Sequence, residues 1–273
     1  MSNATPKIRL KNLHKRFGEK VVLNGLNLDV GVGESVVIMG GSGSGKSVSL
    51  KCLLGLLTPD QGAIEIDGES ILDISEDDRD DINRKFGMLF QHAALFDSMT
   101  VLDNVTFGLI RGKGMTPSEA ADVAYDKLEQ VGLDRSFGSR MPAELSGGQR
   151  KRVGLARAVA LEPEIILFDE PTTGLDPVMG DVINELIVKC TRTLGATTLT
   201  ITHDMASARV IADRIAMLYQ GKIIWIGPAD EVAASGDPRI DQFIHGRADG
   251  RSEERCGATL SSALVRRSTR AYQ

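Results

Sequence analysis

A glycine-rich segment with one lysine near its end carries the clearest chemical signal in this sequence. Residues 40–47 read GGSGSGKS and match the pattern G-x-x-x-x-G-K-[ST]. Glycine allows backbone N–H groups to converge on phosphate oxygens, and a following helix adds its unpaired N-terminal N–H groups. A lysine supplies positive charge for the β- and γ-phosphates, and a serine hydroxyl can bind Mg²⁺. The segment predicts a nucleotide-phosphate site formed by Gly40, Gly41, Ser42, Gly43, Ser44, Gly45, Lys46 and Ser47, with Ser47 as a metal ligand.

Two adjacent carboxylates follow the apolar run IILF at residues 165–168. Such a run predicts a buried strand whose carboxyl end presents Asp169 and Glu170 together. Asp169 is suited to hold Mg²⁺ through the water shell of the ion, and Glu170 is suited to polarise an attacking water as general base. An acidic turn after a strand is the alternative for this segment alone, but the phosphate-binding pattern upstream favours the catalytic interpretation.

A second glycine pair lies in LSGGQ, residues 145–149, ahead of the strongly helical RKRVGLARAVA. Ser146, Gly147 and Gly148 would offer a hydroxyl and bare N–H groups at a helix start, which makes a second phosphate cradle. One nucleotide does not need two cradles from one chain. The simplest arrangement is a head-to-tail pair of chains in which each cradle closes on the nucleotide of the other. An ordinary glycine-containing helix cap is the alternative.

These three segments, in this order, resemble the motifs of an ATP-binding-cassette (ABC) ATPase, the nucleotide-binding subunit of an ABC transporter. The resemblance covers about residues 7–245. It identifies GGSGSGKS as the Walker A motif, IILFDE as Walker B and LSGGQ as the signature, and it implies ATP and Mg²⁺ as cofactors. For the fold it implies an α/β P-loop NTPase of the ABC type, with a mixed sheet core, an antiparallel β subdomain and a helical insertion.

The same resemblance assigns roles to further residues. Gln91, in LFQ, would contact Mg²⁺ and sense the membrane partner, and Gln149 would complete the signature contact to ATP. Asp176, in GLDP, would cross the dimer interface, and His203, in THD, would contact the γ-phosphate. Phe17 stands where the family stacks an aromatic ring on adenine, with a core aromatic as the alternative. Gln91 and His203 therefore join the general base as expected catalytic residues.

Short apolar runs around these motifs predict the elements that position them. GESVVIMG, residues 33–40, predicts a buried strand that delivers the phosphate-binding loop. KIRLKNL, residues 7–13, alternates in polarity and predicts a strand at a sheet edge. DRIAMLYQGKIIWIG predicts a hairpin that turns at Gln220 and Gly221. SEAADVAYDKLEQVGL, residues 118–133, has helical periodicity and predicts a helix.

The sequence divides into one large domain and a tail. Residues 1–246 are expected to form the ABC ATPase domain, with a helical subdomain at about 91–160 inserted in the α/β core. Residues 247–273 are polar and rich in arginine, and we expect them to be flexible or bound to a partner. Anionic lipid headgroups, the second cassette and solvent are three alternative surroundings for these arginines.

Composition argues against several other functions. The 273 residues carry a net charge of -5, which disfavours a protein that binds nucleic acid. The three cysteines have no metal-ligand spacing and fit a reducing cytosol. Neither a signal peptide nor an apolar run of the ~20 residues that span a bilayer is visible. We therefore expect a soluble chain. The ABC resemblance implies that it works at the cytoplasmic face of the inner membrane, attached to integral-membrane permease subunits.

The segment that begins at Gln91, and closer sequence similarities within the family, suggest a partner and a cargo. QHAALFDSMTVLDNV, residues 91–105, is suited to dock a coupling helix of a membrane protein, unless Leu95, Phe96 and Val101 are buried in the helical insertion. MGGSGSGKSVSLKCLLGLL and DPRIDQFIHGRADG resemble the ATPases of Mce-type phospholipid transporters such as the Mla system. This likeness implies a lipid cargo and a lipid-binding Mce-type subunit as a further partner. An importer of amino acids or other polar solutes shares every ATP motif and is the alternative.

Overall fold

The computed structural model of the chain describes residues 5–245. The arginine-rich tail at residues 247–273 lies outside the described residues. The chain divides into two compact units, with the boundary after Val232. The 3₁₀ helix η3, Val232–Ala234, spans this boundary, and the second unit contributes helix α8, Pro238–His245, to the described residues.

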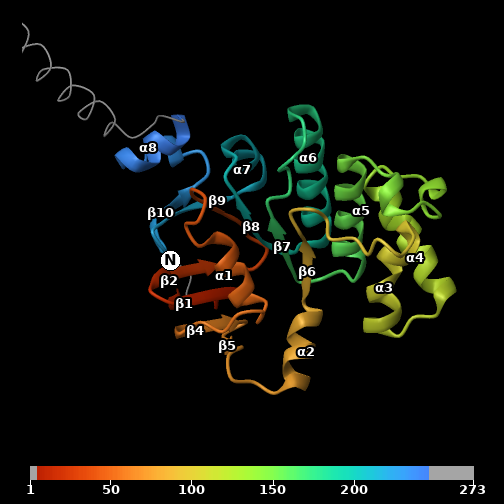
Figure 1. Cartoon of the computed structure of the whole chain (residues 1–273), viewed down its shortest axis with the longest axis horizontal. Helices are drawn as coiled ribbons and strands as arrows, with labels where there is room; N and C mark the ends of the chain where they lie inside the picture. Colours follow the sequence, from red (N-terminus) through yellow and green to blue (C-terminus); the bar gives the residue numbers. More distant parts are fainter. Residues whose placement is uncertain (1–4, 246–273) are drawn as a thin grey trace, which may run out of the picture. The chain divides into compact units, whose positions relative to one another are not determined.

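The first unit is built on a six-stranded sheet in the order β10-β9-β3-β8-β7-β6 (Figure 1). All neighbours are parallel except β10, which is antiparallel to β9, so the sheet is mixed as expected. Most of its strands are rich in apolar residues because both faces of the sheet are covered, although β8, TTLTIT, buries four threonines. They are β3, Ser35–Met39; β6, Phe86–Leu89; β7, Ile165–Asp169; β8, Thr197–Thr202; β9, Arg214–Tyr219; and β10, Lys222–Pro228.

The parallel strands end at one edge of this sheet, and the chemical motifs follow them there. β3 leads into the phosphate loop, residues 40–47, and β7 ends at Asp169 and leads into Glu170. β6 and β8 lead into Gln91 and His203. The carboxyl ends of parallel strands are where open α/β sheets bind their ligands. The topology therefore gathers residues that the chain separates widely.

A second, antiparallel sheet has the strand order β2-β1-β4-β5. Its strands are β1, Ile8–Phe17; β2, Lys20–Val30; β4, Gln61–Ile66; and β5, Glu69–Ser70. β1 pairs with β2 on one side and with β4 on the other, so the expectation that β1 lies at a sheet edge is wrong. Alternating polarity indicates that one face of the strand is buried. It does not indicate whether a strand from later in the sequence pairs with its free edge.

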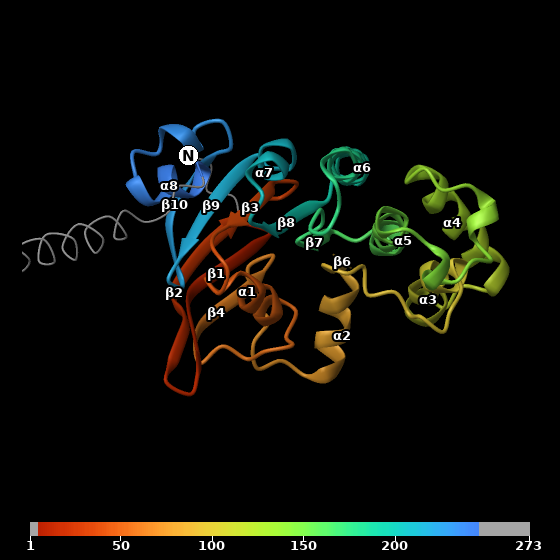
Figure 2. The same cartoon turned by 45° about the horizontal axis from the view of Figure 1, so that its top comes forward.

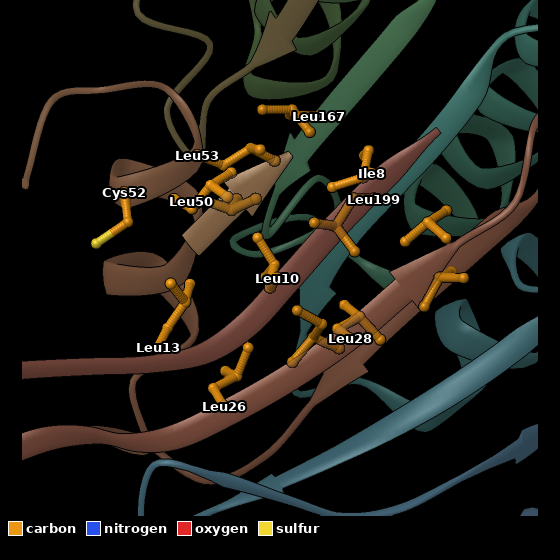
Figure 3. Packing of buried hydrophobic residues seen from close by; sticks show 14 of the residues in the cluster. Ile8, Leu10, Leu13, Leu26, Leu28, Leu50, Cys52, Leu53, Leu167 and Leu199 are labelled. Carbon is orange, nitrogen blue, oxygen red and sulfur yellow. The ribbon is translucent and has the colours of Figure 1, made fainter. Parts of the chain in front are cut away.

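Helix α1, Lys46–Leu53, shares one hydrophobic core with both sheets. This core includes Leu50 of α1, Leu10 of β1, Leu167 of β7 and Leu199 of β8, which are labelled in Figure 3. Each of these leucines is at most 1% exposed, and burying such a side chain stabilises a fold by about 2 kcal/mol. The core therefore holds both ends of the phosphate loop, which joins β3 to α1.

The other side of the large sheet is covered by α6, Pro177–Leu194, and α7, Met205–Ile211, which pack against each other (Figure 2). The predicted β9–β10 hairpin is confirmed, with its turn at Gln220 and Gly221. Both residues have positive φ, 47° and 77°. A Cβ atom on Gly221 would also lie 2.5 Å from the carbonyl oxygen of Val22, so glycine is required there twice over.

Between β6 and β7 the chain forms three mutually packed helices, seen together in Figures 1 and 2. They are α3, Val101–Lys113; α4, Pro117–Gln130; and α5, Gly147–Ala160, with the 3₁₀ turns η1, Arg135–Phe137, and η2, Pro142–Glu144, between α4 and α5. The helix expected over residues 118–133 is confirmed by α4, which begins at Pro117. Among the described residues, no helix combines the length and apolar content needed to cross a membrane.

Candidate nucleotide site

The phosphate loop depends on glycine at its two ends. A Cβ atom on Gly40 would lie 2.3 Å from the carbonyl oxygen of Leu218, and one on Gly45 would lie 2.9 Å from that of Val22. Gly45 also has a φ of 112°, which a residue with a side chain rarely adopts. Between them, a Cβ atom on Gly43 would meet nothing within 4 Å. The loop is thus fixed by the protein at both ends and open on the side where phosphates would bind.

Lys46 lies across this loop. Its Nζ donates hydrogen bonds to the carbonyl oxygens of Gly40 at 2.6 Å and Gly41 at 3.2 Å. Burial lowers the pKa of Lys46, and the negative charges of Glu170 and Asp169 act in the opposite direction. The ammonium is therefore held close to the loop by weak carbonyl partners, which a phosphate can replace with a stronger charged one.

The start of α1 has unused hydrogen-bonding groups. Gly45 is its N-cap and has no side chain to accept from the first N–H groups of the helix. Ser47 is exposed in the first turn, and the buried hydroxyl of Ser44 has no hydrogen-bond partner. Free N–H groups at a helix N-terminus bind anions, so this end of α1 fits a phosphate.

Asp169 has the features of a cation ligand. Its Oδ1 is buried and has no hydrogen-bond partner. Burial raises the pKa of Asp169, with the charge of Glu170 as the second cause. A buried carboxylate oxygen without a donor is costly unless a cation neutralises it, so Asp169 fits the predicted Mg²⁺.

Glu170 is held at the edge of the sheet by three donors. Its Oε2 accepts hydrogen bonds from the hydroxyls of Thr173, at 2.9 Å, and Thr202, at 3.3 Å. Nδ1 of His203 lies 2.9 Å from the same oxygen. Glu170 itself has a φ of 48°, outside the regions that most residues adopt. The geometry directs the carboxylate and places His203, whose side chain is largely exposed, beside the expected general base.

Sequence reasoning did not single out Lys151, which reaches this site from α5. Its Nζ donates hydrogen bonds to the backbone oxygens of Gln91 and Glu170. Burial lowers its pKa to about 8, and the charges of Asp169 and Glu170 oppose that shift. The helical spacing of the sequence could have indicated it. Gly148, Lys151 and Leu155 lie on the buried face of α5, where an apolar residue is expected instead of a lysine.

The signature segment, residues 145–149, forms the start of α5. Ser146 is the N-cap: its hydroxyl accepts from the N–H of Gln149, whose side chain accepts in turn from the N–H of Ser146 at 2.9 Å. Gly147 lies against Leu175, next to Asp176 at the start of α6. Figures 1 and 2 show α1 and α5 on either side of β6, so the two glycine segments of one chain stay apart.

Phe17 and Asp176 are both accessible. The ring of Phe17 is 47% exposed at the end of β1, with Nζ of Lys15 5.7 Å from its centroid, so the alternative of a core aromatic is wrong. Asp176 is the N-cap of α6 and accepts a hydrogen bond from the N–H of Met179 at 3.0 Å. Both side chains are free of the core and able to meet a ligand or a second chain.

The glutamine loop, residues 91–100, borders an apolar groove of about 400 Å³. The two alternatives for this segment were an exposed docking surface and burial in the helical insertion. Val101 is fully buried, Leu95 is half-buried and Phe96 is 43% exposed, so each alternative holds for some of these residues. The rings of Phe96 and Phe107 lie 5.0 Å apart on the groove, and Arg157 lines it as well. An exposed aromatic pair in a groove is a feature of surfaces that bind other proteins.

Comparison with known proteins places the chain in a family. Residues 23–173 match the family described as ABC transporter. The chain is 41% identical to the probable ribonucleotide transport ATP-binding protein mkl of Mycobacterium leprae, over 93% of this chain and 74% of that protein. It is 39% identical to the intermembrane phospholipid transport system ATP-binding protein MlaF of Haemophilus influenzae, over 89% and 92%. It is 38% identical to the histidine/lysine/arginine/ornithine transport ATP-binding protein HisP of Escherichia coli, over 88% and 97%.

Among solved structures, the ATP-binding cassette MJ0796 superposes with a TM-score of 0.74 at 37% sequence identity, over 81% of this chain and 98% of that one. That structure is a dimer in a post-hydrolysis state with ADP and Pi bound. The expected fold class, a P-loop NTPase with a mixed sheet and an antiparallel β subdomain, is confirmed. The family match and these identities show that the chain belongs to the ABC transporter family, as an ATP-binding subunit that hydrolyses ATP.

Proposed function

We propose that this chain powers a transporter that moves phospholipids across or between envelope membranes, at the cytoplasmic face of the inner membrane. The proposal of a phospholipid cargo rests on the similarity to MlaF, a protein named for intermembrane phospholipid transport. The alignment covers 92% of that protein, so it extends well beyond the short ATP motifs that all cassettes share. This extended likeness supports a shared type of transporter, and the second candidate below has an alignment of similar extent.

The residues at the sheet edge divide the work of hydrolysis. The N–H groups of the phosphate loop and Lys46 bind the β- and γ-phosphates, and Glu170 orients and polarises the attacking water. Ser47, Asp169 and Gln91 would hold Mg²⁺, which supplies positive charge to the phosphate oxygens when bound. Burial of this edge strengthens each charged contact made there.

Two chains complete each nucleotide site in this proposal. The signature segment is remote from the phosphate loop of its own chain, and its Ser146 is exposed at the start of α5. A head-to-tail dimer would bring that helix start to the γ-phosphate of the other chain, with Asp176 at the interface. The dimeric state of the related cassette MJ0796 supports this arrangement.

The groove beside the glutamine loop is proposed as the docking site for a coupling helix of the permease. Its exposed Phe96 and Phe107 suit the apolar face of such a helix. Phe90, the residue before Gln91, lines the groove, so a partner bound there would contact the chain next to the catalytic edge.

A polar-solute importer is the second candidate, and a specific likeness favours it. HisP, named for transport of basic amino acids, is 38% identical over 97% of its length. The mycobacterial protein mkl carries a name that gives ribonucleotides as cargo. Cassettes seldom contact the cargo themselves, so the partner subunits decide between these candidates.

The test is to purify the full chain with its partners from membranes in mild detergent, then identify the copurifying proteins and bound lipid by mass spectrometry. A lipid-binding Mce-type subunit and copurified phospholipid are expected. A periplasmic solute-binding protein without lipid would overturn the phospholipid proposal and favour the importer. A Lys46→Ala chain serves as the control, because partner recovery should not require ATP hydrolysis.

A further inference from the structure

Lys151 is a buried cation that joins two parts of the catalytic edge. It lies on α5, just after the signature segment, and is 4% exposed. Its Nζ donates to the carbonyl oxygen of Gln91 and, at 3.1 Å, to that of Glu170. Burying a charge is unfavourable for stability unless it is well compensated, and neutral carbonyls compensate it only in part. Such a residue is better explained by the geometry that it imposes than by the stability that it adds.

Both of these backbone segments adopt conformations that need support. Glu170 has a φ of 48°, and in the glutamine loop Ala93 and Ala94 have φ values of 61° and 45°. Conformations of this kind are unfavourable for residues with a side chain, and persist only where neighbours hold them. The guanidinium of Arg157, also on α5, donates to the carbonyl oxygens of Ala93 at 2.7 Å and Ala94 at 2.8 Å. Helix α5 thus holds the glutamine loop and the peptide of Glu170 together.

We propose that Lys151 is a positioning residue for hydrolysis, which fixes the backbone of Glu170 relative to the glutamine loop. The carboxylate of Glu170 is aligned by Thr173 and His203, but its Cα position depends on its own peptide group, where Lys151 binds. This inference rests on the ATPase activity of the chain and is independent of the cargo.

The position of Lys151 also connects the apolar groove to the general base. Arg157 lines the apolar groove and binds the glutamine loop, and Lys151 binds the same loop at Gln91 and then Glu170. A displacement of the loop by a ligand in the groove is transmitted through one ammonium to the general base. Errors of about 1 Å in the placement of a catalytic group are enough to cost about a hundredfold in rate.

The test compares the steady-state ATPase of the full chain with that of Lys151→Met, which keeps the apolar stem and removes the donor. The expected result is a fall in kcat of about tenfold or more, with the KM for ATP within about twofold of the parent, because the ammonium of Lys151 binds backbone oxygens of Gln91 and Glu170 and is not assigned to the phosphates. Lys151→Gln, whose amide can donate to both carbonyls, is expected to recover most of the lost kcat.

Lys127→Met is the matched control. Lys127 is a helical lysine of similar burial, 7% exposed on α4, and its Nζ binds Glu162 at 3.0 Å, outside the catalytic edge. Its loss should shift the thermal midpoint and leave kcat unchanged. An equal kcat loss in both variants would overturn the proposal, as would a folded Lys151→Met with parental kcat. If Lys151→Met does not fold, Lys151→Ala, which leaves room for water, decides in its place, and parental kcat in that folded variant contradicts the positioning role.

Discussion

At the scale of single residues, the site is marked by polar atoms that the protein leaves unpaired. Ser44 Oγ and Asp169 Oδ1 are buried without a hydrogen-bond partner. Each such atom costs about 1–3 kcal/mol in a folded protein. Both lie at the carboxyl edge of the large sheet, where nucleotide and metal would satisfy them. The protein is thus preorganised for its ligand at a cost in its own stability.

Replacing Lys46 with alanine removes the only loop side chain assigned to the β- and γ-phosphates. We expect Lys46→Ala to weaken ATP binding at least about thirtyfold, since a charge-assisted contact to phosphate contributes roughly 2 kcal/mol or more. The fold should persist, because the substitution removes a buried charge whose pKa is already lowered by burial. Equilibrium binding of a fluorescent ATP analogue measures the effect. Lys51→Ala, exposed on the same helix, is the control, and near-parental binding by Lys46→Ala would contradict the assignment.

Glu170→Gln keeps the shape of the side chain and removes its basicity. Turnover is expected to fall by about a hundredfold or more, the usual contribution of a positioned general base, while ATP binding persists. Single-turnover hydrolysis and a binding measurement on the same sample separate the two effects. Glu185→Gln makes the same chemical change at an exposed position on α6 and should have parental activity. Rapid hydrolysis by Glu170→Gln would show that another group activates the water.

Residues with local patterns were predictable from the sequence, and residues defined by distant contacts were not. GGSGSGKS carries its chemistry in consecutive positions, so the loop and its lysine were visible at once. The unpaired oxygen of Asp169 and the two carbonyl contacts of Lys151 depend on segments far away in the chain. The bond between His203 and Glu170 was likewise invisible, because it arises from the adjacency of β7 and β8.

At the scale of elements, Asn104 anchors the glutamine loop to α3. It is fully buried: its Oδ1 accepts from the N–H of Phe96 at 2.8 Å, and its Nδ2 donates to the carbonyl oxygens of Phe96, Met99 and Thr100. These contacts add to the few backbone hydrogen bonds that this irregular segment makes by itself. The apolar groove therefore has a defined wall although a loop forms part of it.

Asn104→Ala is expected to lower the free energy of unfolding by about 2 kcal/mol, because the N–H of Phe96 and the carbonyl oxygen of Met99 lose the partners that the amide supplies. Urea denaturation measures this change. Asn83→Ala, the same substitution at an exposed position on helix α2, Glu76–Arg84, should change the value by no more than about 0.5 kcal/mol. Equal effects of the two substitutions would mean that the loop finds other partners.

Some helices and strands were predictable from the sequence and others were not. Helix α2, Glu76–Arg84, was not predicted, because EDDRDDINR contains one apolar residue and so has no apolar stripe. It forms where Ser75 accepts from the N–H of Asp78 at its start. β1 was assigned to an edge because its second neighbour, β4, follows only after the phosphate loop and α1. The α4 helix and the β9–β10 hairpin were predicted correctly because their signals, Pro117 and the Gln220–Gly221 turn, are local.

At the scale of the whole molecule, the two glycine segments of one chain lie apart. The phosphate loop and the signature segment each offer free N–H groups at a helix start, and they stand on opposite sides of β6 (Figure 1). The proposed dimer resolves this by using each helix start of one chain against the nucleotide of the other. ATP is then part of the interface, and hydrolysis weakens it. Opening and closing of the pair is the motion that a docked permease would receive.

This arrangement predicts that bound ATP stabilises the dimer of two chains. Glu170→Gln with ATP should form a stable dimer by light scattering after size exclusion, and should return to monomer when ATP is removed. Adding Ser146→Phe to the same chain places a bulky ring at the exposed start of α5, where the partner's phosphates would sit. The double variant should bind ATP as a monomer with parental affinity and fail to dimerise. If it instead loses ATP binding as a monomer, the signature segment serves the nucleotide of its own chain, and the head-to-tail arrangement is wrong.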